Sequence, residues 1–289
     1  MQGEQLKKAL EGYITQMPAL PTSVSKILEI CNNPETSPSD LNKVISLDPV
    51  LMGRVLKLIN SAYYGLNQEI TSLVRAIIML GINTVKNLAL STAILGTISG
   101  RNSNQAINME GFWRHSLTVG VTAKLIAKKR GIDKKKLEEY FISGLLHDIG
   151  KIPLNNKAAT EYIMTLSYSD RNNVSLHDAE EEVLNLNHQT IGVMVAQNWR
   201  LSDAIVDVIK NHHSYSNYSG NNKDILYTVV LSNYFANIME IGFSGNRYPE
   251  KPSDVIYTHL GLTWNHLEDM DDIVEQEIEK AQIFLKLIS

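Results

Sequence analysis

The chain of 289 residues has a single cysteine, Cys31, so no disulfide can form within it. A protein without internal disulfides suits a reducing compartment. Long apolar runs are also missing: none approaches the roughly 20 residues that cross a bilayer, and the polar start over residues 1–8 lacks the apolar core of a signal peptide. These absences predict a cytoplasmic protein that makes no membrane contact.

An excess of positive charge is absent as well. The 31 Asp and Glu residues outnumber 27 Lys and Arg residues, which gives a formal net charge of -4. Proteins that bind nucleic acid usually carry a basic face, so the charge argues against a nucleic-acid partner. An apolar fraction of 44% with 20% charged residues is typical of a globular protein, and the length suits one large domain or two modest ones.

No stretch of useful length alternates apolar and polar residues as a half-buried strand does, whereas helical spacing recurs along nearly the whole chain. Ser37 before Pro38 and Asp48 before Pro49 indicate helix starts, because a polar N-cap precedes a proline at the first helical position. Later helices are expected over residues 111–129, 136–147, 176–185, 188–199, 202–212, 224–241 and 263–287. The sequence predicts an all-α fold.

One break divides the helical pattern into two parts. An apolar helix over residues 73–80 should stop at Gly81, and Asn83 can cap the helix that follows. Two glycines and a polar stretch then interrupt the pattern over residues 96–108. We therefore expect two packed helical subdomains, residues 1–100 and residues 101–289.

A His-Asp pair carries the clearest chemistry. His147 and Asp148 end an apolar helical run, and Lys151 follows three residues after the carboxylate. Neutral imidazole and carboxylate on adjacent residues can bind one divalent ion, and this ligand set suits zinc, iron or manganese. Taken alone, Asp148 could equally cap the next loop and Lys151 could be a solvated charge.

Four further histidines lie near the ends of predicted helices: His115, His188, His212 and His213. Each has an ordinary structural explanation. His115 suits a core histidine bonded to backbone, His188 a polar residue in a first turn, and His212 a favourable partner of the helix macrodipole. Five histidines at successive helix ends, together with Asp148, instead predict one cluster.

Several motifs together resemble the HDOD domain, a branch of the helical HD superfamily. They comprise Leu20–Ser23, Asp48–Leu51, Asn60–Gly65, Ser72–Gly81, His115, His147–Asp148, Trp199–Leu201 and His212–His213. The resemblance runs from about residue 20 to at least residue 213. It implies that the C-terminal subdomain is an HD-type helical bundle.

The resemblance also implies roles for individual residues. His115, His147 and Asp148 match metal ligands of catalytic HD proteins, but the fourth ligand, an aspartate, falls at Asn233. An amide lacks the negative charge and binds a divalent cation less strongly. Lys151 matches a lysine that can assist at the substrate phosphate.

The related HD-GYP phosphodiesterases, which cleave cyclic dinucleotides, bind a second metal. His188, His212 and His213 match the positions that extend the site to it. Two departures weaken this likeness: the loop over residues 214–220 lacks Gly-Tyr-Pro, and Gly111 stands where those enzymes present a glutamate.

Three functions follow as hypotheses. The first, which we favour, is a signalling or regulatory module with a partial metal site and a protein partner in its pathway, because HDOD relatives are mostly regulatory. The second is a metal-dependent phosphohydrolase acting on a nucleotide or cyclic dinucleotide, in which Asp148 and Lys151 take part and a metal ion lowers the pKa of water. The third and weakest treats residues 73–93 as a helix-turn-helix, although residues 77–80 are very apolar for a DNA-reading surface.

Overall fold

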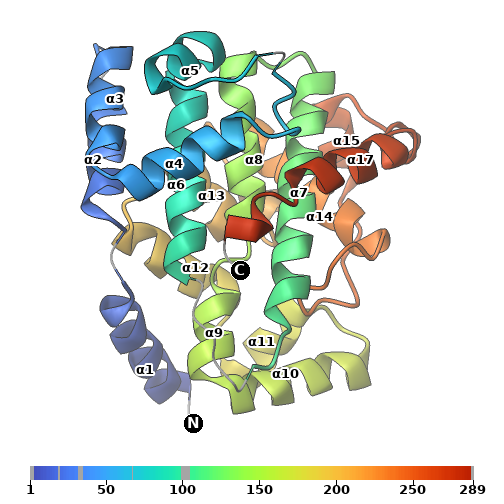
Figure 1. Cartoon of the computed structure of the whole chain (residues 1–289). Helices are drawn as coiled ribbons and strands as arrows, with labels where there is room; N and C mark the ends of the chain where they lie inside the picture. The colour runs from blue at the N-terminus through green and yellow to red at the C-terminus, as the bar shows by residue number, and fades with distance from the viewer. Residues whose placement is uncertain (1–2, 19, 32–34, 67, 99–104, 288–289) are drawn as a thin grey trace.

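A computed structural model describes the chain except residues 1–2, 19, 32–34, 67, 99–104 and 288–289. Helices and loops make up the described part, which contains no strand, so the all-α prediction is confirmed (Figure 1). The first group of helices is α1 (Gly3–Gln16), α2 (Thr22–Cys31), α3 (Pro38–Ser46), α4 (Pro49–Ile59), α5 (Leu73–Leu80) and α6 (Ile82–Ile98). The expected subdomain boundary at residues 100 and 101 lies outside the described residues.

The central part of the molecule is built from a second group of helices. These are α7 (Met109–Lys129), the 3-10 turn η1 (Lys134–Lys136), α8 (Leu137–Leu146), α9 (Lys151–Lys157), α10 (Ala159–Asn172), α11 (Leu176–Leu184), α12 (His188–Asn198), α13 (Asp203–Asn211) and α14 (Lys223–Ile238). The last elements are α15 (Asp254–Leu260), α16 (Trp264–Glu268), α17 (Asp271–Ala281) and η3 (Leu285–Leu287), and η2 (Tyr215–Asn217) precedes α14.

The helix starts follow the local chemistry of the sequence. The Ser37 side chain accepts a hydrogen bond from the Asp40 backbone N–H and forms a capping box with Asp40. The Asp48 side chain caps α4 by accepting a hydrogen bond from the Leu51 backbone N–H. Helix α5 ends at Gly81, whose φ of +88° suits glycine. The expectation for Asn83 was wrong: α6 begins at Ile82, so Asn83 lies inside its first turn.

Two glycines allow the central helices α7 and α8 to approach closely. A side-chain Cβ at Gly144 would lie 2.8 Å from the Cα of Gly120, and one at Gly120 would lie 2.7 Å from the Phe141 carbonyl oxygen. Neither position has room for a larger residue. This contact between backbones holds His115 of α7 and His147 at the end of α8 on facing sides, with ring centroids 5.8 Å apart.

Several expectations for the C-terminal part were incomplete. The single helix expected over residues 263–287 is wrong, because the chain bends after α16 and again before η3. These bends bring Val274 and Ile278 of α17 into the core beside α7 and place the ring of Phe284 5.0 Å from that of Phe141. Helices α10 and α15 were not anticipated, and Lys151 begins α9.

Helix α6 does not suit the helix-turn-helix hypothesis. Leu88, Ala89 and Thr92 on this helix are fully buried, so it cannot enter a DNA groove. On α5, by contrast, Ile78 is 70% exposed although the helix is apolar. Among the described residues no single helix is long and apolar enough to cross a membrane; α5 and α6 reach that length and composition only together, across a bend of 119°.

Candidate metal centre

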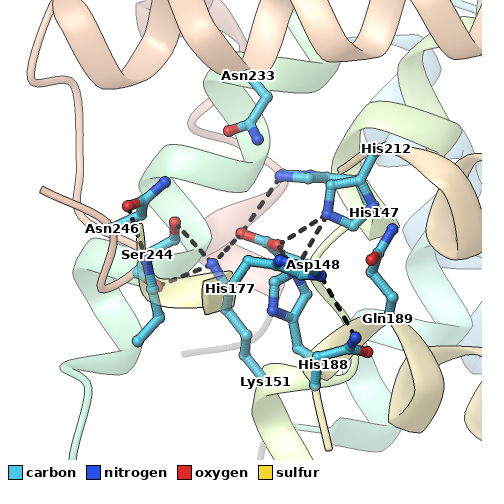
Figure 2. A network of polar contacts seen from close by, with 12 residues as sticks. His147, Asp148, Lys151, His177, His188, Gln189, His212, Asn233, Ser244 and Asn246 are labelled. Carbon is cyan, nitrogen blue, oxygen red and sulfur yellow. Dashed lines mark hydrogen bonds and ion pairs between the residues drawn. The ribbon is translucent and has the colours of Figure 1, made fainter. Parts of the chain in front are cut away.

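The ends of several helices converge in the interior of the second group. Histidines from four helices meet there with the carboxylate that follows α8. Figure 2 shows three of them, His147, His188 and His212, around Asp148. His115 comes from α7, His147 caps the end of α8, His188 begins α12, and His212 caps the end of α13. The structure thus brings together all the residues that the sequence singled out: His115, His147, Asp148, Lys151, His188, His212, His213 and Asn233.

Asp148 is the centre of the cluster and is 1% exposed. Its Oδ1 lies 3.3 Å from His188 Nε2 and 3.6 Å from His212 Nε2. Its Oδ2 lies 3.3 Å from His147 Nε2 and accepts a hydrogen bond of 2.7 Å from Lys151 Nζ. The two oxygens of one carboxylate therefore face two different groups of side chains.

Backbone carbonyls set the tautomers of two rings. His147 Nδ1 lies 2.7 Å from the Gly144 carbonyl oxygen, and His212 Nδ1 lies 3.1 and 3.0 Å from the carbonyl oxygens of Val208 and Ile209. A carbonyl oxygen only accepts hydrogen bonds, so Nδ1 must donate in both rings. Each neutral ring then presents a lone pair at Nε2, the atom that faces Asp148.

A buried carboxylate from α11 orients His188. Glu180 Oε2 accepts hydrogen bonds from His188 Nδ1 (2.6 Å) and from the His188 backbone N–H (2.8 Å), while its Oε1 accepts one from the Tyr162 hydroxyl (2.6 Å). The sequence analysis missed Glu180 because it lies in an acidic run that resembles a solvated helix face. A signal was present, since Glu180 follows Leu176 and Ala179 at helical spacing on the buried face of α11.

His115 has a different environment. Its Nε2 lies 3.0 Å from Asn233 Oδ1, and that same oxygen accepts a second hydrogen bond of 2.9 Å from Asn237 Nδ2. Because an amide oxygen only accepts, His115 Nε2 carries its proton in this arrangement. The simple expectation that His115 bonds to backbone does not hold.

Lys151 is buried and fully engaged. Its Nζ donates to Asp148 Oδ2 and lies 3.2 Å from the Ser244 carbonyl oxygen and 3.3 Å from Ser244 Oγ. Ser244 belongs to the loop after α14, where Gly242 adopts a φ of +77° with its Cα against the His115 backbone. Figure 2 shows this loop beside the cluster. No sequence motif indicated the role of Ser244.

Burial determines the charge of the cluster. It lowers the pKa of His115 to about 3 and that of His188 well below its ordinary value. Burial alone would raise the pKa of Asp148, but the Lys151 ammonium that donates to its Oδ2 opposes it, and that pKa is held well below the ordinary value. Neutral imidazoles around an ionised carboxylate are the forms that bind divalent metals.

Two sets of side chains could hold a metal ion, and Asp148 belongs to both. The first comprises His115, His147 and Asp148, and the second Asp148, His188, His212 and His213. Two buried atoms of these sets, Asp148 Oδ1 and His147 Nε2, have no hydrogen-bond partner in the described part of the chain. Unpaired acceptors inside a protein are costly, so the donor set fits a divalent cation.

His177 is a further histidine that the sequence analysis missed. Its ring stacks on that of His213 with centroids 4.6 Å apart, and it lies 6.1 Å from the ring of His188. The position follows Leu176 at the start of α11, where nothing in the sequence separates it from a surface residue. It extends the row of imidazoles toward the exterior.

A helical bundle with a buried His-Asp centre is the arrangement of the HD superfamily. The family model of the HDOD domain matches residues 17–215 of this chain, which therefore belongs to the HDOD family. The match includes both the N-terminal helices and the histidines up to His213, but ends before Asn233.

Solved structures and one relative share the fold. The crystal structure of an HDOD domain protein from Geobacter sulfurreducens has a TM-score of 0.74 at 24% identity, covering 96% of each chain. That of a proposed phosphohydrolase from Shewanella amazonensis SB2B has a TM-score of 0.70 at 22% identity, covering 97% of this chain and 98% of that one. A Treponema pallidum (strain Nichols) protein is 25% identical over 80% of this chain, which spans 44% of the length of that relative.

Proposed function

We propose that this protein is a signalling or regulatory module of the HDOD family. In this proposal its His-Asp cluster binds a divalent metal ion as part of the fold, and its role is to contact a protein partner rather than to turn over a substrate. Iron, manganese and zinc suit the nitrogen and oxygen ligands.

The engagement of Lys151 is the observation that carries this proposal. The resemblance to HD hydrolases assigns this lysine a role at a substrate phosphate. Here the ammonium has three hydrogens and three oxygen neighbours, one from Asp148 and two from Ser244, and the residue is 3% exposed. A phosphate could use this cation only after the loop that carries Ser244 moved away.

Asn233 supports the same conclusion. Its amide oxygen is shared between His115 and Asn237, and an amide in place of a carboxylate adds no negative charge to hold a metal. A metal ion that is held less firmly would also position a nucleophile less well.

The convergence of the histidines favours a second candidate, a metal-dependent phosphohydrolase. The histidines and the aspartate of both candidate metal sets are present, and all of them except the half-buried His213 are buried. A bound divalent ion would supply a polarised phosphate and an activated water. A nucleotide or cyclic dinucleotide is the substrate class for this alternative.

A hydrolysis assay separates the two candidates. The wild type, Asn233→Asp and His147→Ala would each be incubated with a phosphomonoester and with cyclic dinucleotides in the presence of Mn²⁺ or Fe²⁺. We expect the wild type to be no faster than His147→Ala, while Asn233→Asp tests whether a restored carboxylate uncovers turnover. Robust hydrolysis by the wild type that His147→Ala abolishes would contradict the regulatory function and identify an enzyme.

A further inference from the structure

The carboxylate of Asp148 divides the cluster into two unequal parts. We call Asp148, His188, His212 and His213 the inner half, and His115, His147, Asp148 and Asn233 the outer half. We propose that the chain binds a single divalent ion, that this ion occupies the inner half, and that Glu180 positions His188 for it. This inference rests on the metal site of the proposed function and assigns the ion to one part of it.

The two oxygens of Asp148 differ in what they can offer a cation. Oδ2, which faces His147, already accepts a hydrogen bond from the Lys151 ammonium at 2.7 Å. Oδ1 has no hydrogen-bond partner in the described part of the chain and faces His188 and His212. At Oδ2 an incoming cation would have to compete with the Lys151 ammonium. At Oδ1 it would find an unused lone pair.

Acceptors without a donor meet in the inner half. Because Nδ1 of His188 donates to Glu180 and Nδ1 of His212 donates to backbone carbonyls, both Nε2 atoms present lone pairs. These two atoms lie only 3.1 Å apart, and both face Asp148 Oδ1. With both Nε2 atoms unprotonated, three acceptors face one another, and a cation among them, either a metal ion or a proton shared by the two rings, offsets their repulsion.

The separations fit one shared ion. Atoms that bind a metal at about 2.1 Å lie about 3 to 3.5 Å from one another. The three pairs among His188 Nε2, His212 Nε2 and Asp148 Oδ1 measure 3.1, 3.3 and 3.6 Å. His213, which offers a further nitrogen within 4.8 Å of the others, can complete the set.

Glu180 adds a second carboxyl group next to the inner half. A metal-binding histidine that donates its other ring N–H to a carboxylate is held in the right tautomer and becomes more basic. Glu180 serves His188 in this way and is itself held by the Tyr162 hydroxyl. We therefore infer that Glu180 is a positioning residue that does not itself contact the ion.

The outer half lacks these features. The Nε2 atom of His115 carries a proton that is bonded to Asn233, so this ring would have to change tautomer before it could bind an ion through that atom. Among the described residues its Nδ1 has no hydrogen-bond partner that would favour the change. His147 Nε2 presents its lone pair to Asp148, whereas the lone pair of His115 then lies on Nδ1.

Cobalt titration of matched histidine variants tests the inference. Wild type, His115→Ala, His188→Ala and His212→Ala would be titrated with Co²⁺ and followed by calorimetry and by the visible absorption of the bound ion. His115→Ala is the matched control, because it removes an equally buried imidazole from the same cluster. Far-ultraviolet circular dichroism and thermal melting would establish that each variant folds.

We expect the wild type to bind close to one Co²⁺ per chain. Loss of His188 or His212 should weaken binding by at least about 100-fold, whereas loss of His115 should change it by less than about threefold. Weaker binding by His115→Ala than by His188→Ala, equal losses in all variants, binding of two ions or no binding would each overturn the inference. Hydrolysis by the wild type would contradict the proposed function instead and leave the position of the ion untouched.

Two additions make the test independent of folding defects. Crystals of the Co²⁺-loaded wild type would locate the ion by its anomalous scattering, and a position next to His115 and away from His188 would overturn the inference without any variant. Glu180→Gln keeps an acceptor for His188 but removes the charge, so Co²⁺ affinity should fall about tenfold and the absorption bands should shift. Unchanged affinity and bands would show that Glu180 has no positioning role.

Discussion

The interiors of the two groups of helices differ in chemistry. In α2–α6 the buried polar residues are small and uncharged: Ser23, Thr84, Asn87, Ser91 and Thr92. In the second group, α7–α14, the buried polar residues include the ionisable side chains His115, Glu138, His147, Asp148, Lys151, Glu180, His188 and His212. Burying ionisable groups is costly unless they are paired, so their concentration marks the part of the molecule where function outweighs packing.

The two groups of helices meet at a contact that contains both packed aromatic rings and a buried ion pair. Tyr63, from the loop before α5, packs its ring 5.9 Å from Phe141 and 5.6 Å from Phe284. The ammonium of Lys124 lies 4.4 Å from the centroid of the Tyr63 ring and forms a buried ion pair with Glu138. Each group therefore covers a surface that the other could not leave exposed to water.

Removing the first group should have the largest effect. A fragment of residues 108–289 would expose the faces of α7 and α8 that Tyr63 and α6 cover, and large bare apolar patches drive association. We expect this fragment to aggregate and to show no cooperative melting in calorimetry. A soluble, cooperatively melting fragment would show instead that the groups are independent domains.

Breaking the Lys124–Glu138 ion pair, which lies within the second group at its contact with Tyr63, should have the next largest effect. Lys124→Met leaves the carboxylate of Glu138, which is 3% exposed, without its partner, and this should lower the free energy of unfolding by about 3 to 5 kcal/mol. Denaturant unfolding measures the change. The double variant Lys124→Met/Glu138→Leu is the control: it should recover most of the loss, and a double variant as unstable as the single one would disprove the pairing argument.

Metal removal tests the polar interior directly. An ion present at one hundred times its Kd stabilises the state that binds it by about 2.7 kcal/mol, which corresponds to a rise in Tm of about 4 to 5 °C for a chain of this size. We expect EDTA to lower the Tm and Mn²⁺ or Zn²⁺ to restore it. Asp148→Asn should remove this response, and an equal metal response in that variant would mean that the ion binds elsewhere.

A substitution on the exposed face of the first group should have the smallest effect. Ile78 is 70% exposed on α5, so Ile78→Ser should change the free energy of unfolding by no more than about 0.5 kcal/mol. Its neighbour Ile77, which is 2% exposed, gives the contrast, since Ile77→Ala should cost about 2 to 5 kcal/mol. Similar losses in both would show that the exposed side of α5 packs against another surface.

Local chemistry made much of the fold predictable. Ser37 and Asp48 cap their helices as their sequence context indicates, because capping depends on residues within one turn. The break of the last helix at residues 269–270 was not predictable, because it depends on where α17 must lie to bury Val274 against α7. Such a requirement exists only in the folded molecule.

The sequence predicted which residues form the candidate site, but it did not predict the hydrogen bonds that join them to other elements. The spacing of the histidines pointed to one cluster, and the fold places them together. The pairing of Lys151 with Ser244 and of Glu180 with His188 joins separate elements through single side chains, and neither has a motif. In the proposed function, it is the Lys151–Ser244 contact that makes the site closed to a substrate phosphate.

The metal content of the wild-type protein, purified without chelator or a histidine tag, tests the central claim most directly. The buried acceptors of Asp148 and His147 predict that mass spectrometry of the elements will find close to one divalent transition-metal ion per chain. A protein that carries no such ion, and takes up none when supplied with Mn²⁺, Fe²⁺ or Zn²⁺, would contradict the account of this cluster as a metal centre.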